Sequence, residues 1–243
     1  MTQQYAATAE DAPSHANGVL APTAPRALTT RQLEDRQIIH RAENLRREAD
    51  AFRELRTRLC ADSDGAPFLT LVVAVTSGGG ASFVARNLAA AFAFDESKGA
   101  VLVDCNARHP NQGDALGLDS GKRGLKAYLD DEHTQISDVV HPSGLPGLDV
   151  VPWGTRREDA GDAFGSTRMR VLLDSLRAQY GRRYVIIDGP AISDGPDAAI
   201  LSALVDRVVI VTAYGSETSE AVRAAIADFP PGKVAGVVFN QRP

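Results

Sequence analysis

The run Val73-Ala74-Val75-Thr76-Ser77-Gly78-Gly79-Gly80-Ala81-Ser82 decides the fold of this chain. Its first four residues end an apolar stretch typical of a buried strand, and residues 83–94 after it have the composition of a helix. A strand, a glycine loop and a helix in that order form an anion cradle, because the loop N–H groups and the helix N-terminus point at the same place. A complete phosphate-binding loop has Lys and then Ser or Thr after its last glycine. Here Ala81 stands where that lysine would be.

Short apolar runs rich in Val and Ile alternate with helical stretches along the rest of the chain. The runs lack the polar alternation of half-exposed strands, which is typical of strands buried on both faces of a parallel sheet. This order predicts an α/β fold, a P-loop NTPase-like three-layer sandwich with a mainly parallel sheet, in which ligands bind at the carboxyl ends of the strands. The expected strands are 68–76, 100–104, 148–151, 184–188, 207–212 and 234–239, and the expected helices are 82–94, 121–130, 166–180, 197–204 and 216–227.

The N-terminal part of the chain differs in composition from the rest. Residues 1–30 are rich in Ala, Pro and Thr without an apolar period, so we predict a disordered tail there. Residues 31–62 are charged and helical and form a predicted amphipathic arm, which precedes a domain that spans 63–243. Two interpretations of the arm stay open: it packs on its own domain, or it docks on a neighbouring subunit. The apolar stripe of the arm consists of Leu45, Ala49, Phe52, Leu55 and Leu59.

The composition argues against several classes of protein. The formal net charge of −5 disfavours a mainly electrostatic nucleic-acid binder. The two cysteines, Cys60 and Cys105, give no disulfide framework and fit a reducing compartment. No apolar run approaches the ~18 residues of a membrane helix, and the N-terminus lacks the residue order of a signal peptide. We therefore expect a cytoplasmic protein that has no nucleic-acid partner and reaches a membrane only through another protein.

Two of the expected strands end in an acidic residue. Asp104 ends the second strand and is followed by Arg108, and Asp188 ends a later apolar strand. Acids at this edge of a parallel sheet face metal ions in phosphoryl-transfer enzymes, and an arginine there can reach a phosphate. Taken singly, each acid fits a cap of the next turn equally well. Their order after the glycine loop favours a metal and phosphate site.

Several segments, in order, resemble the bacterial tyrosine kinase (BY-kinase) family, which regulates capsule and exopolysaccharide synthesis and is related to the partitioning and cell-division ATPases. Residues 50–56 resemble the family's Glu-x-x-Arg-x-x-Arg oligomerisation helix, with Asp50 for Glu and with Arg53 and Arg56 retained. The resemblance runs from about Asp50 to the C-terminus and implies that Asn240 lies near the adenine. Further on, residues 146–154, 184–190 and 236–240 are similar to the family's PGLDVLPAG segment, its Walker B strand and its closing strand.

The chain departs from the family pattern at the phosphate loop. The loop is shorter by about three residues and lacks the lysine, although Ser82 keeps the metal-side hydroxyl. The family's Asp-x-Asp-x-Arg has Asn106 as its second acid here, and the sequence ends without the family's tyrosine cluster. Loss of the lysine removes a charge-assisted contact worth roughly 1.5–3 kcal/mol. Together with the shorter loop, the missing second acid and the missing tyrosine cluster, this loss predicts a pseudokinase. Arg108 is the best-placed substitute cation, whereas we expect Arg86 to point elsewhere.

The resemblance implies a cytoplasmic component of exopolysaccharide, capsule or holdfast polysaccharide biosynthesis and export. It would form homo-oligomers and regulate an integral-membrane polysaccharide co-polymerase of the chain-length-determinant type at the inner membrane. The implied ligand is ATP or ADP with Mg²⁺, although the altered loop predicts that binding is weakened or lost. Two alternatives stay open: an active ATP-dependent protein-tyrosine kinase of the same pathway and, less favoured, a positioning or partitioning ATPase. The implied site residues are catalytic Asp104, Asp188 and Arg108; nucleotide-binding Ser77, Gly78, Gly79, Gly80, Ala81, Ser82 and Asn240; metal-binding Ser82, Asp104 and Asp188; and, at the oligomer interface, Asp50, Arg53 and Arg56.

Overall fold

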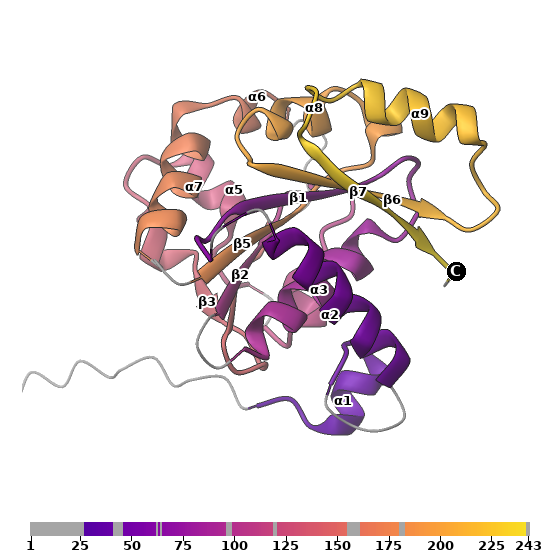
Figure 1. Ribbon diagram of the computed structural model, residues 1–243. Helices are drawn as coiled ribbons and strands as arrows, with labels where there is room; N and C mark the ends of the chain where they lie inside the picture. Colours follow the sequence, from indigo (N-terminus) through magenta and orange to yellow (C-terminus); the bar gives the residue numbers. More distant parts are fainter. Residues whose placement is uncertain are drawn as a thin grey trace, which may run out of the picture.

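The fold is a parallel sheet covered by helices on both faces, as the sequence predicts (Figure 1). A computed structural model describes residues 27–40, 46–61, 63, 65–95, 99–118, 121–154, 161–179 and 183–241. Its seven strands lie in the order β3-β4-β2-β5-β1-β6-β7, and every neighbouring pair is parallel except β3 with β4. The strands are β1 (Leu69–Ala74), β2 (Gly99–Asp104), β3 (His141–Pro142), β4 (Leu148–Val151), β5 (Arg183–Asp188), β6 (Arg207–Ala213) and β7 (Val234–Asn240).

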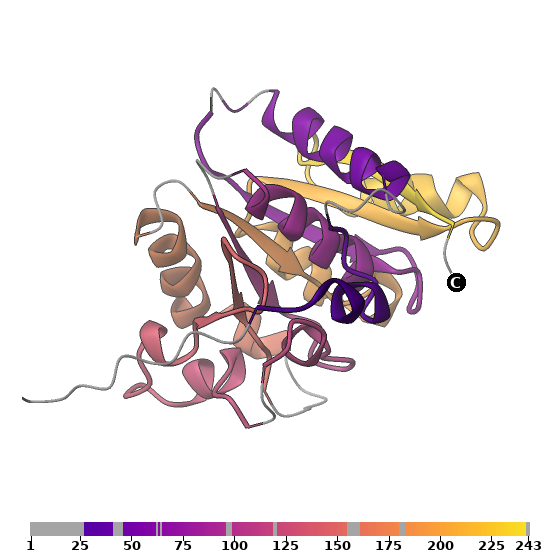
Figure 2. The same ribbon diagram turned by 90° about the horizontal axis from the view of Figure 1, so that it is seen from below.

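The helices form two layers, one on each face of the sheet (Figures 1 and 2). Helices α1, α2 and α3 contribute to one hydrophobic core, and α5, α7, α8 and α9 contribute to the other. None of the described helices is long and apolar enough to cross a membrane. The helices are α1 (Thr30–Asp35), α2 (Arg46–Cys60), α3 (Ala81–Ala93), α4 (Gln112–Ala115), α5 (Leu125–Asp130), α6 (Gly161–Phe164), α7 (Thr167–Gln179), α8 (Asp197–Ser202) and α9 (Ser219–Ala227).

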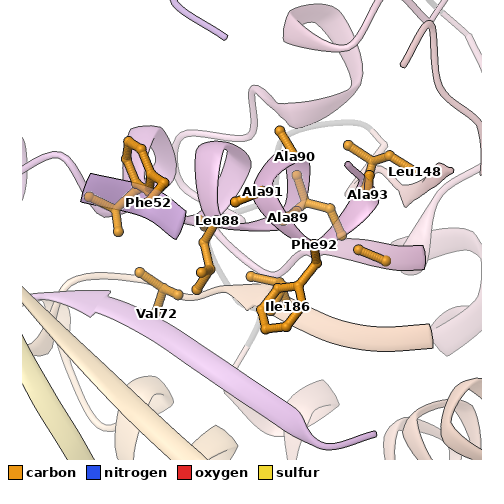
Figure 3. Close-up of a cluster of buried hydrophobic side chains, with 14 of the residues drawn as sticks. Phe52, Val72, Leu88, Ala89, Ala90, Ala91, Phe92, Ala93, Leu148 and Ile186 are labelled. Carbon is orange, nitrogen blue, oxygen red and sulfur yellow. The ribbon is translucent and has the colours of Figure 1, made fainter. Parts of the chain in front are cut away.

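The central strands alternate their side chains between these two cores. In β1, Val72 and Ala74 belong to the core under α3, whereas Leu71 and Val73 belong to the opposite core. This is the two-residue period of a strand, and both sets are apolar because both faces are covered. Figure 3 shows the core under α3, in which Leu88 lies over Val72 and Phe92 lies over Ile186 of β5. The composition of the strands therefore follows from their position inside the sandwich.

The N-terminal arm differs from the predicted single helix. It consists of α1 and α2, and the segment between them places Ile38 and Ile39 in the core. In addition, the backbone N–H of Leu28 donates to the carbonyl of Gly144 at 2.8 Å, so the end of the predicted tail belongs to the fold. The burial of Ile38 and Ile39 could not be predicted from the sequence, because an isolated pair of isoleucines gives no helical period. Residues 1–26 of the predicted tail lie outside the described residues.

The arm packs on its own domain, which is the first of the two interpretations left open. Phe52 and Leu59 of α2 are buried, and the rings of Phe52 and Phe83 of α3 make an edge-to-face contact with centroids 5.9 Å apart. Phe52 and Leu59 thus join the arm to the hydrophobic core that lies under α3. Leu45, the first residue of the predicted stripe, lies outside the described residues.

Candidate functional site

The glycine loop joins β1 to α3 in a conformation that only glycine adopts readily. Gly78 and Gly80 have φ of +83° and +94°, in the left-handed region. A Cβ on Gly80 would lie 2.0 Å from the Nδ2 atom of Asn240, and that Nδ2 donates to the carbonyl of Gly79 at 3.3 Å. The end of β7 is thus held against the loop, and the expected place of Asn240 near an adenine stays a prediction.

A cavity of about 450 Å³ opens over this loop at the carboxyl edge of the sheet. Its walls include the loop and the first turn of α3, residues 77–83, together with Arg86, Asn106, His109 and Asn111. Arg86 lines this cavity, contrary to the expectation that its side chain points elsewhere. Arg108, the predicted substitute cation, is not among the residues that line the cavity; it is exposed, and its Nη2 donates to the carbonyl of Asp194 at 3.0 Å.

The two strand-end acids lie side by side at the carboxyl edge of the sheet. Asp104 of β2 is the direct register partner of Asp188 of β5, and both side chains are buried. The carboxylate of Asp104 accepts three backbone N–H bonds, from Asn106, Asn111 and Gln112, at 3.0–3.1 Å. Asp104 therefore fixes the chain that follows β2, whereas the Oδ1 atom of Asp188 is buried without a hydrogen-bond partner.

Gln112 connects the elements of the site and was not foreseen. Its fully buried amide Nε2 donates to Asp188 Oδ2 at 2.5 Å and to the carbonyl of Ser82 at 3.1 Å. Its Oε1 accepts from Arg86 Nη1 at 3.5 Å. The sequence carries no signal for this role beyond the position of Gln112 shortly after Asp104. An amide here can donate to the acid and accept from the arginine at the same time, which neither a carboxylate nor an ammonium group can do.

Burial dominates the electrostatics of the pair of acids. Burial, together with the neighbouring charge of Asp188, raises the pKa of Asp104 to about 8 against the lowering effect of its three N–H donors. Burial likewise raises the pKa of Asp188 to about 6, although hydrogen bonds from Gln112 and Ser82 and the charge of Arg86 oppose the shift. The pair therefore carries less than its full double charge near neutral pH.

The predicted metal-binding residues fit a divalent cation only in part. The side chains of Ser82 and Asp188 interact, and the buried, unpartnered Oδ1 of Asp188 is an oxygen of the kind that Mg²⁺ prefers. Both oxygens of Asp104, in contrast, are occupied by backbone donors. The described residues contain no cluster of three or more His, Cys, Asp or Glu side chains suited to holding a metal. Any metal here would depend on Ser82, Asp188 and the phosphates of a ligand.

Relatives of this chain share its sequence over the same region. It is 35% identical over 194 residues to a protein named "Putative tyrosine-protein kinase EpsB" of Ralstonia nicotianae, which covers 79% of this chain and 25% of the relative. It is 28% identical over 194 residues to tyrosine-protein kinase wzc of Salmonella typhi, covering 79% of this chain and 26% of that protein. The chain belongs to the bacterial tyrosine kinase family. It spans about a quarter of the length of these BY-kinases. No protein-family model matches it.

Solved structures agree with this assignment. The chimerical protein CapA2B2 superposes with a TM-score of 0.70 at 27% identity, covering 79% of this chain and 84% of that one. The kinase domain of Escherichia coli tyrosine kinase ETK gives a TM-score of 0.70 at 21% identity and covers 90% of each chain. The septum site-determining protein MinD of Pyrococcus horikoshii, solved with Mg-ADP, gives a TM-score of 0.57 at 18% identity and covers 71% of this BY-kinase chain and 70% of its own. The fold is thus that of BY-kinase domains and, more distantly, of MinD.

Proposed function

We propose that this chain is a pseudokinase of the BY-kinase family that regulates a membrane polysaccharide co-polymerase in exopolysaccharide, capsule or holdfast polysaccharide biosynthesis and export. The observation that carries the proposal is the start of α3, where Ala81 follows the αL residue Gly80 and leaves the cradle without a lysine. Phosphoryl transfer depends on positive charge placed at the transferred group. The loop itself has no lysine to supply that charge, and the N–H of Gly79 already donates to the carbonyl of Thr76 at 3.1 Å.

The two acids support the same proposal. Asp104 is engaged by three backbone N–H donors, so it holds the segment after β2 and is poorly placed to accept a proton from a substrate hydroxyl. Asn106, at the family's second-acid position, lines the cavity but cannot act as a base. These features favour a site that binds an anion and does no chemistry on it.

The ligand we propose for the cradle is ATP or ADP. The phosphates would lie on the loop N–H groups of residues 77–82, and the base would lie near Asn240, whose amide contacts the loop. Mg²⁺, when bound, would supply charge stabilisation for the phosphates, with Ser82 and Asp188 as its nearest protein groups.

The partner surfaces we propose are α2 for homo-oligomers and a cytoplasmic segment of the co-polymerase for recruitment to the inner membrane. Arg53 of α2 has an exposed side chain whose Nη1 donates to Asp50 on the same helix at 3.0 Å, and such a surface pair contributes little to stability. Arg56 instead donates to the carbonyl of Ala91 near the end of α3, at 2.7 Å. Arg53 is therefore the better candidate for a contact with another subunit.

Complementation of a gene deletion in the native bacterium tests the proposal. Asp188→Asn is expected to restore polysaccharide export to the wild-type level, with no phosphotyrosine formed on the chain or its partner by wild type or variant. Arg53→Glu is expected not to restore export. Loss of export with Asp188→Asn, together with Mg-ATP-dependent phosphotyrosine formation by the wild type, would instead establish an active kinase. That alternative draws its support from the interaction of Ser82 with Asp188, two residues to which the resemblance assigns a metal.

A further inference from the structure

Helix α3 carries a buried arginine on the face that borders the cradle. Arg86 follows Ser82 by one helical turn, so both side chains lie on the same side of α3. The side chain of Arg86 lines the cavity over the glycine loop, and only 9% of the residue is exposed. A guanidinium group is expensive to bury unless its donors are satisfied, because it remains charged.

The donors of Arg86 are not satisfied by the fold. Its Nε is buried without a hydrogen-bond partner, and its Nη1 reaches the amide oxygen of Gln112 only at 3.5 Å. In the described part of the chain no ion pair joins Arg86 to an acid, although the charges of Asp188 and Asp104 stabilise its charged form. The guanidinium group of Arg86 is planar and has N–H donors without a close partner. Such a group, at a cavity lined by a glycine loop, is suited to binding a phosphate.

We propose that Arg86 is the phosphate-binding cation of this cradle, in place of the lysine that the loop lacks, and that it makes phosphate binding independent of a divalent metal. This inference rests on the proposed function, because it concerns the same cradle. It extends that function by naming the residue that supplies the charge. It also replaces Arg108 in the role that the sequence analysis gave it.

The surroundings of Arg86 explain why a metal becomes dispensable. A divalent cation is drawn to a site by uncompensated carboxylates. Here the oxygens of Asp104 accept backbone N–H bonds, one oxygen of Asp188 accepts the amide of Gln112, and Arg86 adds one positive charge nearby. The oxygens of Asp104 are thus not open to a cation and Arg86 offsets one negative charge, so we expect the anion to bind to the loop and to Arg86 without a metal bridge.

Binding of inorganic pyrophosphate to the full chain tests this proposal, because pyrophosphate needs no adenine site. Calorimetric titrations are run in EDTA and in Mg²⁺ for wild type, Arg86→Met and the matched control Arg108→Met. Methionine keeps the length of the apolar stem of arginine and removes the guanidinium group with its charge. Wild type is expected to bind equally well in EDTA and in Mg²⁺, Arg86→Met to bind at least about tenfold more weakly, and Arg108→Met to remain within about twofold.

A second measurement keeps the proposal falsifiable if Arg86→Met fails to fold. The Nε–H resonance of Arg86 in a ¹⁵N spectrum of the wild type is expected to shift when pyrophosphate is added in EDTA. A resonance that does not move, a strict requirement for Mg²⁺, or unchanged affinity in a folded Arg86→Met would overturn the inference. Pyrophosphate binding without ADP binding would leave the role of Arg86 intact and would contradict only the proposed nucleotide ligand.

Discussion

At the residue scale, Asp188 is a fully buried acid that has fewer hydrogen-bond donors around it than Asp104 has. One of its oxygens accepts from Gln112 at 2.5 Å, and the other is buried without a partner. Its pKa rises from 3.8 to about 6, since burial penalises the carboxylate more than its neighbours favour it. The unfolded chain ionises near pH 4, so unfolding releases a proton between pH 4 and pH 6, and the contribution of this group to stability falls as pH rises through that range.

Asp188→Asn is therefore expected to stabilise the protein above pH 6. The asparagine oxygen can accept from Gln112, and the substitution leaves no charge at this buried position. It also removes the repulsion between the charges of Asp188 and Asp104. Urea unfolding is expected to show a gain of about 2 kcal/mol at pH 8 and a clearly smaller gain at pH 5. Asp174→Asn on the exposed face of α7 is the control and should change little at either pH. An equal gain at both pH values would contradict the electrostatic explanation.

Gly80 offers a second test at this scale, because two separate constraints act on it. Its φ of +94° disfavours any other residue by about 1–2 kcal/mol, and a Cβ would also meet Asn240 at 2.0 Å. Gly232 has φ of +82° with open space around it, so Gly232→Ala measures only the free-energy cost of placing alanine at positive φ. Gly80→Ala is expected to lose more stability than Gly232→Ala in urea unfolding. Adding Asn240→Ala should remove most of the difference; if it does not, the contact with Asn240 is not the cause.

At the scale of elements, the strands were predictable and the N-terminal segment was not. A strand such as β1 is buried on both faces, so its composition alone identifies it. Strand β3 has two residues, His141 and Pro142, and offers no pattern to detect. Ile38 and Ile39 form a buried pair between charged stretches, which hides their place in the core. Local composition therefore identifies an element only where burial extends over several residues.

The same reasoning explains which residues of the site could be predicted from the sequence and which could not. The two acids were expected at one edge because each ends a parallel strand, and the register of Asp104 with Asp188 brings them together. Gln112 and Arg86 were not recognised, since their roles depend on contacts across 76 residues, from Gln112 to Asp188, and across 26 residues, from Arg86 to Gln112. A sequence pattern read along the chain does not contain such contacts.

Asn87 of α3 makes the N-terminal segment part of the domain, and its removal tests that conclusion. Its Oδ1 accepts from the N–H of Ile39 at 2.7 Å, and its Nδ2 donates to the carbonyls of Gln37 and Phe83 at 3.0 Å. Asn87→Ala leaves the buried N–H of Ile39 unpaired, so we expect a loss of about 2–4 kcal/mol.

Limited trypsin digestion should then cut after Arg36 at least several times faster in Asn87→Ala than in wild type, because the segment detaches before the core unfolds. Asp174→Ala on α7 serves as the control. Equal cleavage rates in Asn87→Ala and wild type would mean that the hydrophobic contacts of the isoleucines hold the segment without Asn87.

At the scale of the whole molecule, α2 belongs with α1 and α3 to the helical layer on one face of the sheet (Figure 2). A cavity of about 250 Å³ lies beside it, lined by residues that include Arg53, Arg56 and Phe94. Arg56 is committed to the carbonyl of Ala91, so the charge available to another subunit on this side is that of Arg53. Closed homo-oligomers repeat such a contact at every interface, which multiplies the effect of one residue.

Arg53→Glu is thus expected to abolish self-association while leaving the fold intact. The residue is exposed and its pair with Asp50 is worth little, so its reversal should not change the free energy of unfolding by more than about 0.5 kcal/mol. Arg58 lies on the same helix, is equally exposed and pairs with Glu54, which makes Arg58→Glu a control of identical charge change. Sedimentation velocity should show oligomers for wild type and Arg58→Glu and a monomer for Arg53→Glu. Equal dissociation of both variants would mean that the net charge of α2, and not Arg53 itself, controls self-association. Unaltered oligomers in Arg53→Glu would mean that Arg53 does not contribute to the interface.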